Sequence, residues 1–327
     1  MEYLRGIASL AVAWFHLTNT YSHGFASWTG SYGWLGVDVF FVLSGFIIPY
    51  SLWSGDRAPS LRTFVDFLGR RIVRLEPPYF ASLILVLVLA YVSAATPGFR
   101  GPPPEYTVPQ VALHLFYMIP LTHYPWLQPV YWSLAYEFVF YLAAGLAYWV
   151  LSGKNTASCL IASLLLLSAV ATGWLPPRFL LFVIGVYLFR NVAGLETLGI
   201  SIAVACCAGL AIAHYESVAT GIVGILTALM IKLGRNIEMQ RTTGKLLLFL
   251  GAISYSLYLV HVPIGGRVVN LGSRIITEPL EQFFLSIFAL MISIGFAWVF
   301  YRAVERPSAR LSRHLSQKQN LLGFAPN

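Results

Sequence analysis

Charged residues are scarce in this sequence. Asp, Glu, Lys and Arg together make up 10% of its 327 residues, whereas ordinary soluble domains carry about 25%. Hydrophobic residues make up 57% of the chain, and the mean hydropathy is +0.71. The scarcity of charge excludes an ordinary soluble domain and predicts an all-α integral membrane protein. No Ser/Gly-rich linker or long charged tail interrupts the apolar pattern, so residues 1–327 are predicted to form a single transmembrane domain.

Cysteines, repeats and a removable leader are also lacking. Cys159, Cys206 and Cys207 all lie in apolar runs, which excludes a disulfide framework. The N-terminus leads directly into an apolar segment without a small-residue cleavage site, so we expect the first helix to be retained. No internal repeat or paired broken helices of the kind found in inverted-repeat transporters are present. The net charge of +8 comes from short basic clusters between apolar runs, which membrane topology explains better than nucleic-acid binding.

Long apolar runs, in contrast, are abundant. A bilayer core about 30 Å thick requires about 20 helical residues to cross it. Ten runs near this length are predicted to be transmembrane helices, at 4–20, 34–53, 77–96, 130–151, 156–174, 178–193, 197–214, 217–233, 245–264 and 282–302. A further apolar run at 110–119 is too short to cross and is predicted to be interfacial or re-entrant.

Basic residues divide unequally between alternate connections of these helices. If the N-terminus is cytoplasmic, only Arg100, Arg178, Arg267 and Arg274 fall on the outer side, and the other Lys and Arg residues, including Arg57, fall on the cytoplasmic side. Cytoplasmic loops of membrane proteins carry the excess of Lys and Arg. The asymmetry therefore predicts an even number of helices and places both termini in the cytoplasm, in a multi-pass protein of the cell (inner) membrane.

Two ionisable residues are predicted to lie at similar depths in the membrane. His16 follows Arg5 by eleven residues, which the helical rise places roughly 16 Å above the cytoplasmic face. Glu137 lies roughly 10 Å below the outer face by the same rise. A carboxylate beside a buried imidazole favours one tautomer and raises its basicity, as a general base acting on a hydroxyl requires. His16 and Glu137 are therefore the predicted catalytic pair. The alternative is that His16 only hydrogen-bonds to a neighbouring helix.

Two further ionisable residues, Asp38 and His261, are predicted to lie closer to the outer interface. Ionisable groups in transmembrane helices cost at least about 2.5 kcal/mol on insertion scales, so each requires a reason. For these two the favoured interpretation is solvation or local pairing. None of the four residues has the spacing of a metal site, so no metal is expected.

A basic segment precedes the third predicted helix. Arg71 and Arg74 are three residues apart and would share one helix face, with Arg70 beside them. Arginine binds phosphate oxygens bidentately and keeps its charge, so this cluster suits a phosphorylated cytoplasmic ligand. A topology determinant or a lipid-headgroup contact is the alternative. Pro77 and Pro78 are predicted to begin the helix, which would place these arginines at the membrane surface.

Five motifs in order make the sequence resemble membrane-bound acyltransferase family 3, the O-acyltransferases that modify bacterial surface and secreted carbohydrates. The resemblance covers nearly the whole chain. The motifs are Leu4-Arg5-Gly6-Ile7-Ala8 with His16; the run GVDVFFVLSGF at 36–46; Arg71 and Arg74 leading to Pro77 and Tyr79; Trp132-Ser133-Leu134 with Glu137, Phe140 and Tyr141; and Ser254-Tyr255-Ser256-Leu257-Tyr258-Leu259 with His261 and Pro263.

This resemblance implies transfer of an acyl group, expected to be acetyl, from cytoplasmic acetyl-CoA to a hydroxyl of a carbohydrate or lipid-linked glycan such as an O-antigen or exopolysaccharide unit. It also implies that His16 is essential, either as general base or as an acyl-carrying nucleophile. The predicted CoA-binding residues are Arg5, Arg70, Arg71 and Arg74. The predicted acceptor-binding residues are Asp38, Trp132, Tyr258 and His261.

The sequence departs from the family pattern at two positions. Phe138 stands where a second acidic residue often follows Glu137, so Glu137 would have to act without that neighbour. Leu75 replaces the usual isoleucine after the second arginine. Because the chain ends at Asn327 without an extracytoplasmic esterase-like domain, a stand-alone transferase is expected.

Two other functional classes compete with the transferase. In a transporter or flippase, His16, Glu137 and Asp38 would relay protons or bind a polar substrate. A channel-like or structural membrane protein is the third class, but several buried ionisable groups speak against it. Acyl-CoA turnover by the purified protein separates the first two, because a transporter would show none.

Overall fold

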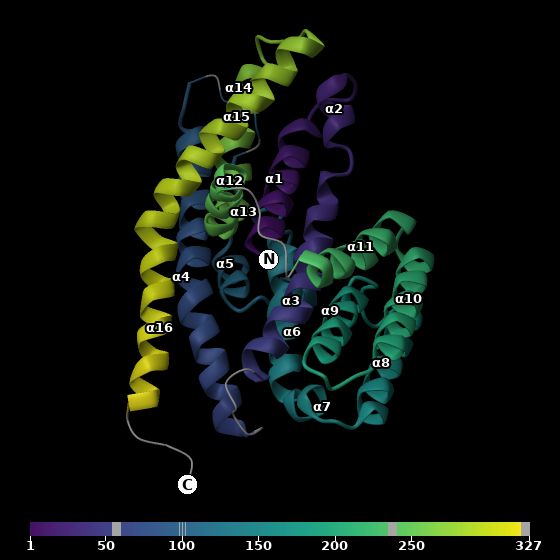
Figure 1. The fold of residues 1–327 in the computed structure, drawn as a ribbon. Coiled ribbons are helices and arrows are strands. Elements are labelled where there is room, and N and C mark those ends of the chain that lie inside the picture. The colour runs from purple at the N-terminus through teal and green to yellow at the C-terminus, as the bar shows by residue number, and fades with distance from the viewer. Residues whose placement is uncertain (54–59, 98, 100, 102, 235–240, 322–327) are drawn as a thin grey trace. The chain divides into compact units, whose positions relative to one another are not determined.

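The computed structural model describes residues 1–53, 60–97, 99, 101, 103–234 and 241–321 (Figure 1). Every element in these ranges is helical, which confirms the predicted all-α class. Arg57 and Arg100, which were used to predict the orientation, lie outside the described residues.

The chain divides into two compact units, each assembled from separate stretches. Unit 1 contains Met1–Val12, Gly33–Leu68 and Val139–Ala252. Unit 2 contains Ala13–Tyr32, Gly69–Phe138 and Ile253–Asn327. Three helices begin in one unit and end in the other: α1 (Glu2–Thr18), α4 (Leu61–Ala94) and α6 (Tyr131–Leu146).

The remaining helices belong to single units. Those of unit 1 are η1 (Gly33–Leu35), α3 (Gly36–Trp53), α7 (Tyr148–Ser152), α8 (Thr156–Ala171), α9 (Phe179–Val192), α10 (Leu198–Tyr215), α11 (Val218–Gly234) and α12 (Arg241–Ala252). Those of unit 2 are α2 (Phe25–Gly30), α5 (Val108–Leu115), η2 (Ile119–Leu121), α13 (Ser254–His261), η3 (Val262–Gly266), α14 (Arg267–Gly272), α15 (Pro279–Phe300), η4 (Tyr301–Glu305) and α16 (Arg306–Leu321).

Each predicted transmembrane run overlaps one or more helices, although 77–96 covers only the second half of α4. Within the described residues, four helices are long and apolar enough to cross a membrane, at Phe25–Trp53, Leu61–Ala94, Leu198–Tyr215 and Pro279–His314. A fifth is added if Gly244–Ala252 and Ser254–Gly272 count as one broken span. Several other apolar helices, such as α8, α9 and α11, are shorter than this. The total of ten crossings and the cytoplasmic position of both termini therefore stay predictions.

In unit 1, glycine allows α3 and α9 to pack at very short distance. A methyl group placed on Gly45 would strike the carbonyl oxygen of Phe182, and one placed on Gly185 would strike that of Val42. Small residues permit such close backbone approach between membrane helices.

The start of α4 differs from the prediction. Pro77 and Pro78 were expected to begin a helix, but α4 starts at Leu61 and contains both prolines in its interior. That prediction was wrong. Proline removes a backbone donor, but membrane helices tolerate it where other groups satisfy the freed carbonyls. Close by, the hydroxyl of Tyr255 donates to the carbonyl of Leu75 at 3.0 Å, so α13 contacts this part of α4.

The last helices of unit 2 form one long run, in which α15 continues through η4 into α16 (Figure 1). Near its start, Ala289 of α15 packs in a buried cluster with Leu17, Tyr21 and Val269. At its other end, the hydroxyl of Ser312 in α16 donates to the carbonyl of Arg70 in α4 at 2.9 Å. This run therefore contacts both the end of α1 and the basic segment of α4.

Candidate functional site

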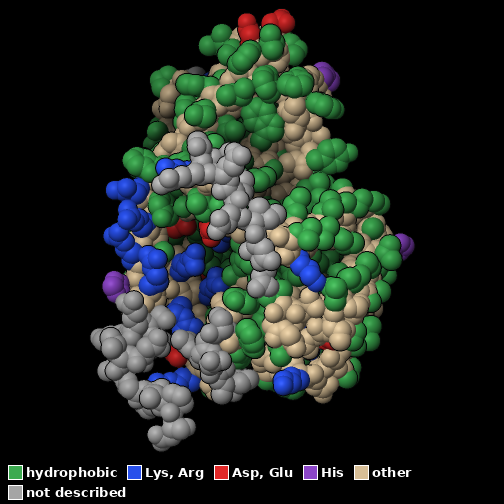
Figure 2. All heavy atoms as spheres, in the orientation of Figure 1, with side chains coloured by type: hydrophobic (Ala, Val, Ile, Leu, Met, Phe, Trp, Pro, Cys, Tyr) green, Lys and Arg blue, Asp and Glu red, His purple; other side chains and the backbone are tan. Residues whose placement is uncertain are grey.

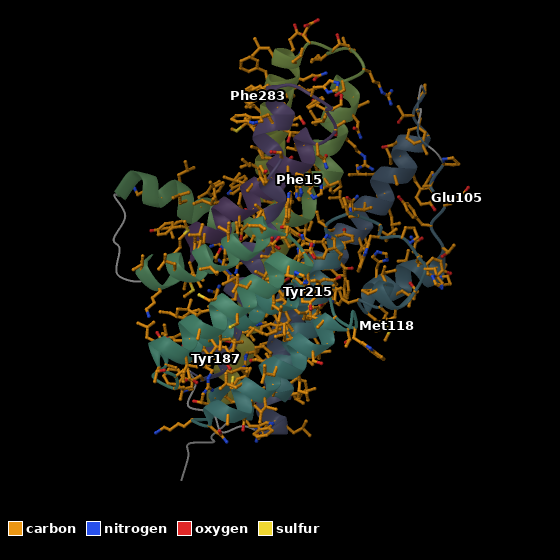
Figure 3. All side chains as sticks on the ribbon, turned by 90° about the vertical axis from the view of Figure 1, so that its right-hand side faces the viewer. Phe15, Glu105, Met118, Tyr187, Tyr215 and Phe283 are labelled. Carbon is orange, nitrogen blue, oxygen red and sulfur yellow. The ribbon has the colours of Figure 1, made fainter. Side chains whose placement is uncertain are left out.

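His16 lies in the last turn of α1, within unit 2. Its side chain is only partly buried. One neighbour is the ring of Phe15 (labelled in Figure 3), whose centroid lies 5.0 Å from that of His16. A further neighbour is the ring of His261, at 5.3 Å. A partly accessible imidazole beside a second imidazole can exchange a proton with a bound hydroxyl and still be held by a protein partner.

His261 ends α13 and is completely buried. Its Nδ1 lies 2.9 Å from the carbonyl oxygen of Leu257. A carbonyl only accepts, so Nδ1 carries the proton and Nε2 presents a bare lone pair. Among the described residues, Nε2 has no hydrogen-bond partner. The predicted local pairing of His261 is thus confirmed for one nitrogen, and the side chain is buried.

Helix α13 is attached to the start of α6 through a tyrosine. The hydroxyl of Tyr258 lies 2.5 Å from the hydroxyl of Ser133 and donates to the carbonyl of Val130 at 3.0 Å. Trp132, the residue between them, packs edge-on against Tyr136 at 5.2 Å. Tyr258 therefore joins two of the family-like motifs directly, and its hydroxyl is occupied by protein contacts.

Glu137 lies on α6 and is partly buried. It is close enough to Tyr258 to influence it electrostatically. The ring contact that the structure establishes for His16 is with His261, and the pairing of His16 with Glu137 stays a prediction. Both residues belong to unit 2.

Glu305 is a buried carboxylate that sequence reasoning missed. It lies at the end of the π-helical turn η4 and accepts two hydrogen bonds from Ser256, from the backbone N–H at 3.1 Å and from the hydroxyl at 2.5 Å. Ser256 is in the first turn of α13, where backbone N–H groups have no partner inside the helix. Single π-helical turns are frequent at functional sites, and a second one, η3, directly follows His261.

The predicted donor-binding arginines Arg70, Arg71 and Arg74 all lie on α4, in unit 2. They sit in the interior of this helix rather than before its start. Arg74 is exposed, and the other two are partly buried. Figure 2 shows Lys and Arg side chains gathered on the side of the molecule where α4 and α16 run. This surface can attract an anionic ligand of either kind considered above, a phosphorylated substrate or a lipid headgroup.

Beside these arginines, Tyr117 reaches α4 from the short apolar run at 110–119. Its hydroxyl donates to the buried carboxylate of Glu76 at 3.1 Å, and its ring stacks on those of Tyr79 and Phe138 at 4.9 and 4.8 Å. Burial raises the pKa of Tyr117 well above its ordinary value. The run thus contacts the middle of α4, while the next residue, Met118, is exposed (Figure 3). Its interfacial or re-entrant position stays a prediction.

Tyr117 also has an unusual backbone, with φ of 56°. A bulky residue in this left-handed region is strained and persists only where its surroundings hold it. The carboxylate of Glu76 and the two stacked rings supply that restraint. Sequence alone carried no signal for it, because nothing local requires a left-handed residue at this position.

The other predicted site residues, Asp38 and Arg5, belong to unit 1. The side chain of Asp38 is completely buried and pairs with Arg178, whose Nε donates at 3.1 Å. Arg178 also pairs with Glu216 at 2.8 Å and lies over the ring of Trp34. Local pairing, the favoured interpretation of Asp38, is therefore what the structure shows. Its predicted contact with the acceptor stays a prediction.

Comparison with known protein families shows which family the chain belongs to. A family model described as an acyltransferase domain matches residues 1–302. The chain belongs to acyltransferase family 3. The predicted site residues of this family 3 acyltransferase all lie inside the matched range, whereas Glu305 lies just beyond it.

One curated relative of this family 3 protein is the peptidoglycan O-acetyltransferase OatA of Listeria monocytogenes. It is 33% identical over 88 residues, which are 26% of this chain and 12% of the relative. The chain thus matches only a small part of that protein's length. No solved structure matches the chain.

Proposed function

We propose that this family 3 acyltransferase transfers an acyl group, expected to be acetyl, from acyl-CoA to a hydroxyl group of a carbohydrate. Family membership supports acyl transfer, and the relative's description as an O-acetyltransferase supports the acetyl group and the sugar acceptor. The observation that carries the proposal is the placement of His16, which is partly exposed and flanked by a buried histidine.

In the proposed reaction, His16 acts as a general base. Its unprotonated ring nitrogen takes the proton of the acceptor hydroxyl as the oxygen attacks the thioester carbon. The C–S bond then breaks, and the departing thiolate of CoA receives the proton from His16. The products are an O-acyl sugar and free CoA. Attack by His16 itself, through an acyl-histidine, would give the same products in two steps.

The donor would be held by its phosphates. Arg70, Arg71 and Arg74 offer several guanidinium groups on one stretch of α4, and such groups bind phosphate oxygens with charge-assisted hydrogen bonds. Arg5 is proposed to take part as well. Transfer from cytoplasmic acyl-CoA to a lipid-linked or exported glycan, such as an O-antigen or exopolysaccharide unit, would place the protein in the inner membrane as a multi-pass enzyme.

Purified protein in nanodiscs, incubated with radiolabelled acetyl-CoA and oligosaccharides from the bacterial envelope, tests the proposal. We expect label in the oligosaccharide fraction, or in free acetate when no acceptor is added, and neither product from the His16→Ala variant. Radiolabel is preferable to a thiol reagent, because Cys206 and Cys207 are exposed free thiols. Absence of both products from the unaltered protein would favour the transporter alternative.

A further inference from the structure

Two histidines in unit 2 share the same local geometry. His114 and His261 are both completely buried. In each, Nδ1 lies 2.9 Å from the carbonyl oxygen of the residue four positions earlier, Gln110 or Leu257. That contact requires a proton on Nδ1, so in the neutral form of each ring Nε2 is an acceptor.

The two rings differ in the use of Nε2. In His114 this nitrogen accepts a hydrogen bond from the backbone N–H of Leu127 at 3.0 Å, so the ring is fully bonded. In His261 the same nitrogen is buried and has no partner in the described part of the chain. Buried polar atoms are nearly always hydrogen-bonded, and an exception calls for an explanation.

The ring nearest to His261 in this region with a polar hydrogen to offer is that of His16. The centroids lie 5.3 Å apart, with the rings tilted by 44°. This separation is within reach of one N–H···N bond, in which the nitrogens approach to about 3 Å. His16 is only partly buried. Tyr258, the other ring beside His261, already donates its hydroxyl hydrogen to Val130.

We propose that Nε2 of His261 accepts a hydrogen bond from one ring nitrogen of His16 in the working enzyme. The donating nitrogen then carries the proton, and the opposite nitrogen of His16 is left bare for the acceptor hydroxyl. His261 is a positioning residue in this arrangement, and its role differs from the direct contact with the acceptor that the sequence predicted.

A neutral His261 can orient His16 because the single ring proton of His261 is already hydrogen-bonded within its own helix. Its Nδ1–H is bonded to Leu257, so Nε2 accepts only, and it cannot compete with His16 as donor. When His16 takes the hydroxyl proton, the bond to His261 remains and continues to orient the ring. Base catalysis generally relies on a third group that orients the base. The inference rests on the proposed function for its catalytic meaning, but the hydrogen bond itself does not depend on turnover.

The tautomer of His16 tests the inference directly. Nitrogen-15 NMR of selectively labelled histidine, with the His16 signal assigned by its loss in His16→Ala, reports which nitrogen is protonated. In the unaltered protein we expect one dominant tautomer. In His261→Leu, which removes the acceptor, we expect a mixture, and in His261→Gln, whose amide oxygen can accept, we expect the dominant tautomer to return. His114→Leu is the matched control and should leave the His16 signal unchanged.

Kinetics provide the second readout. His261→Leu should lower kcat roughly tenfold or more, with KM for acetyl-CoA unchanged and partial recovery in His261→Gln. An unchanged His16 tautomer in a folded His261→Leu protein would overturn the inference, whatever the activity. If the tautomer changes but the unaltered protein transfers no acetyl group, the inference stands and the proposed function fails.

Discussion

Ser256 donates both its backbone N–H and its hydroxyl to the same carboxylate oxygen of Glu305. The two residues are 49 positions apart in the sequence. Their contact fixes the first turn of α13, the eight-residue helix that ends at His261. Glu305 therefore helps to determine where the second histidine of the site lies.

Replacing Glu305 should weaken the fold. Glu305→Ala leaves the buried N–H of Ser256 without an acceptor, which costs about 1–3 kcal/mol, and Glu305→Gln should cost less because its amide oxygen can still accept. Thermal unfolding in detergent measures the effect. Glu281→Ala, at an exposed acidic residue in the first turn of α15, should change stability by no more than about 0.5 kcal/mol. Equal effects of the two alanine variants would contradict this role.

The Asp38–Arg178 pair gives a second prediction. Asp38→Asn should destabilise the protein by about 1–3 kcal/mol, because it weakens a charged hydrogen bond to a completely buried carboxylate. The double variant with Arg178→Gln should cost less than the sum of the single variants, since the two residues interact. The free energies of unfolding of the unaltered protein, the two single variants and the double variant, measured with denaturant or heat, give the interaction energy of the pair. If the stability losses of the two single variants are simply additive, and Asp38→Asn but not Arg178→Gln raises the KM for the acceptor, the result would instead support the substrate-binding prediction for Asp38.

Stability should depend on pH through His114. Burial lowers the pKa of His114 below its ordinary value of 6.5, so the unfolded chain binds a proton at a higher pH than the folded chain does. The stabilising contribution of neutral His114 is complete above pH 6.5 and is lost as the pH falls below that value. The melting temperature of the unaltered protein should therefore fall more steeply between pH 7 and pH 5 than that of His114→Gln. Parallel pH profiles would argue against this assignment.

Glycine packing in unit 1 predicts a contrast between two alanine variants. Gly45→Ala places a methyl group against the carbonyl of Phe182, and such overpacking typically costs about 1–3 kcal/mol. Gly295→Ala adds a methyl group on α15 where nothing lies within 4 Å, so its effect should range from neutral to a gain of about 1 kcal/mol from helix propensity. Thermal unfolding of both variants tests this contrast. Equal melting temperatures of the two variants would contradict it.

Much of the fold could be predicted from the sequence because long apolar runs have few structural options in a membrane. The predicted runs at 156–174 and 178–193 coincide closely with α8 and α9. The start of α4 could not be predicted in this way. Two adjacent prolines normally begin or break a helix, and nothing in the local sequence indicates that α4 continues on both sides of them.

The candidate site could be predicted only in part. His16 stood out because an ionisable residue in an apolar run is costly. Its neighbour His261 was singled out for the same reason, but its closeness to His16 depends on tertiary packing. Glu305 gave no signal, since it stands between Arg302 and Arg306 at the end of an apolar run and looks like a solvated surface residue. Its role follows only from its hydrogen bonds to Ser256.

The proposed acyl transfer depends most directly on His16. Mass spectrometry of surface glycans from cells that lack the gene, complemented with either the unaltered protein or His16→Ala, tests this directly. We predict that the unaltered protein adds one acetyl group per glycan repeat, and that His16→Ala, at equal abundance in the membrane, adds none. Acetylated glycans in cells with His16→Ala would contradict both the general-base and the acyl-histidine mechanisms.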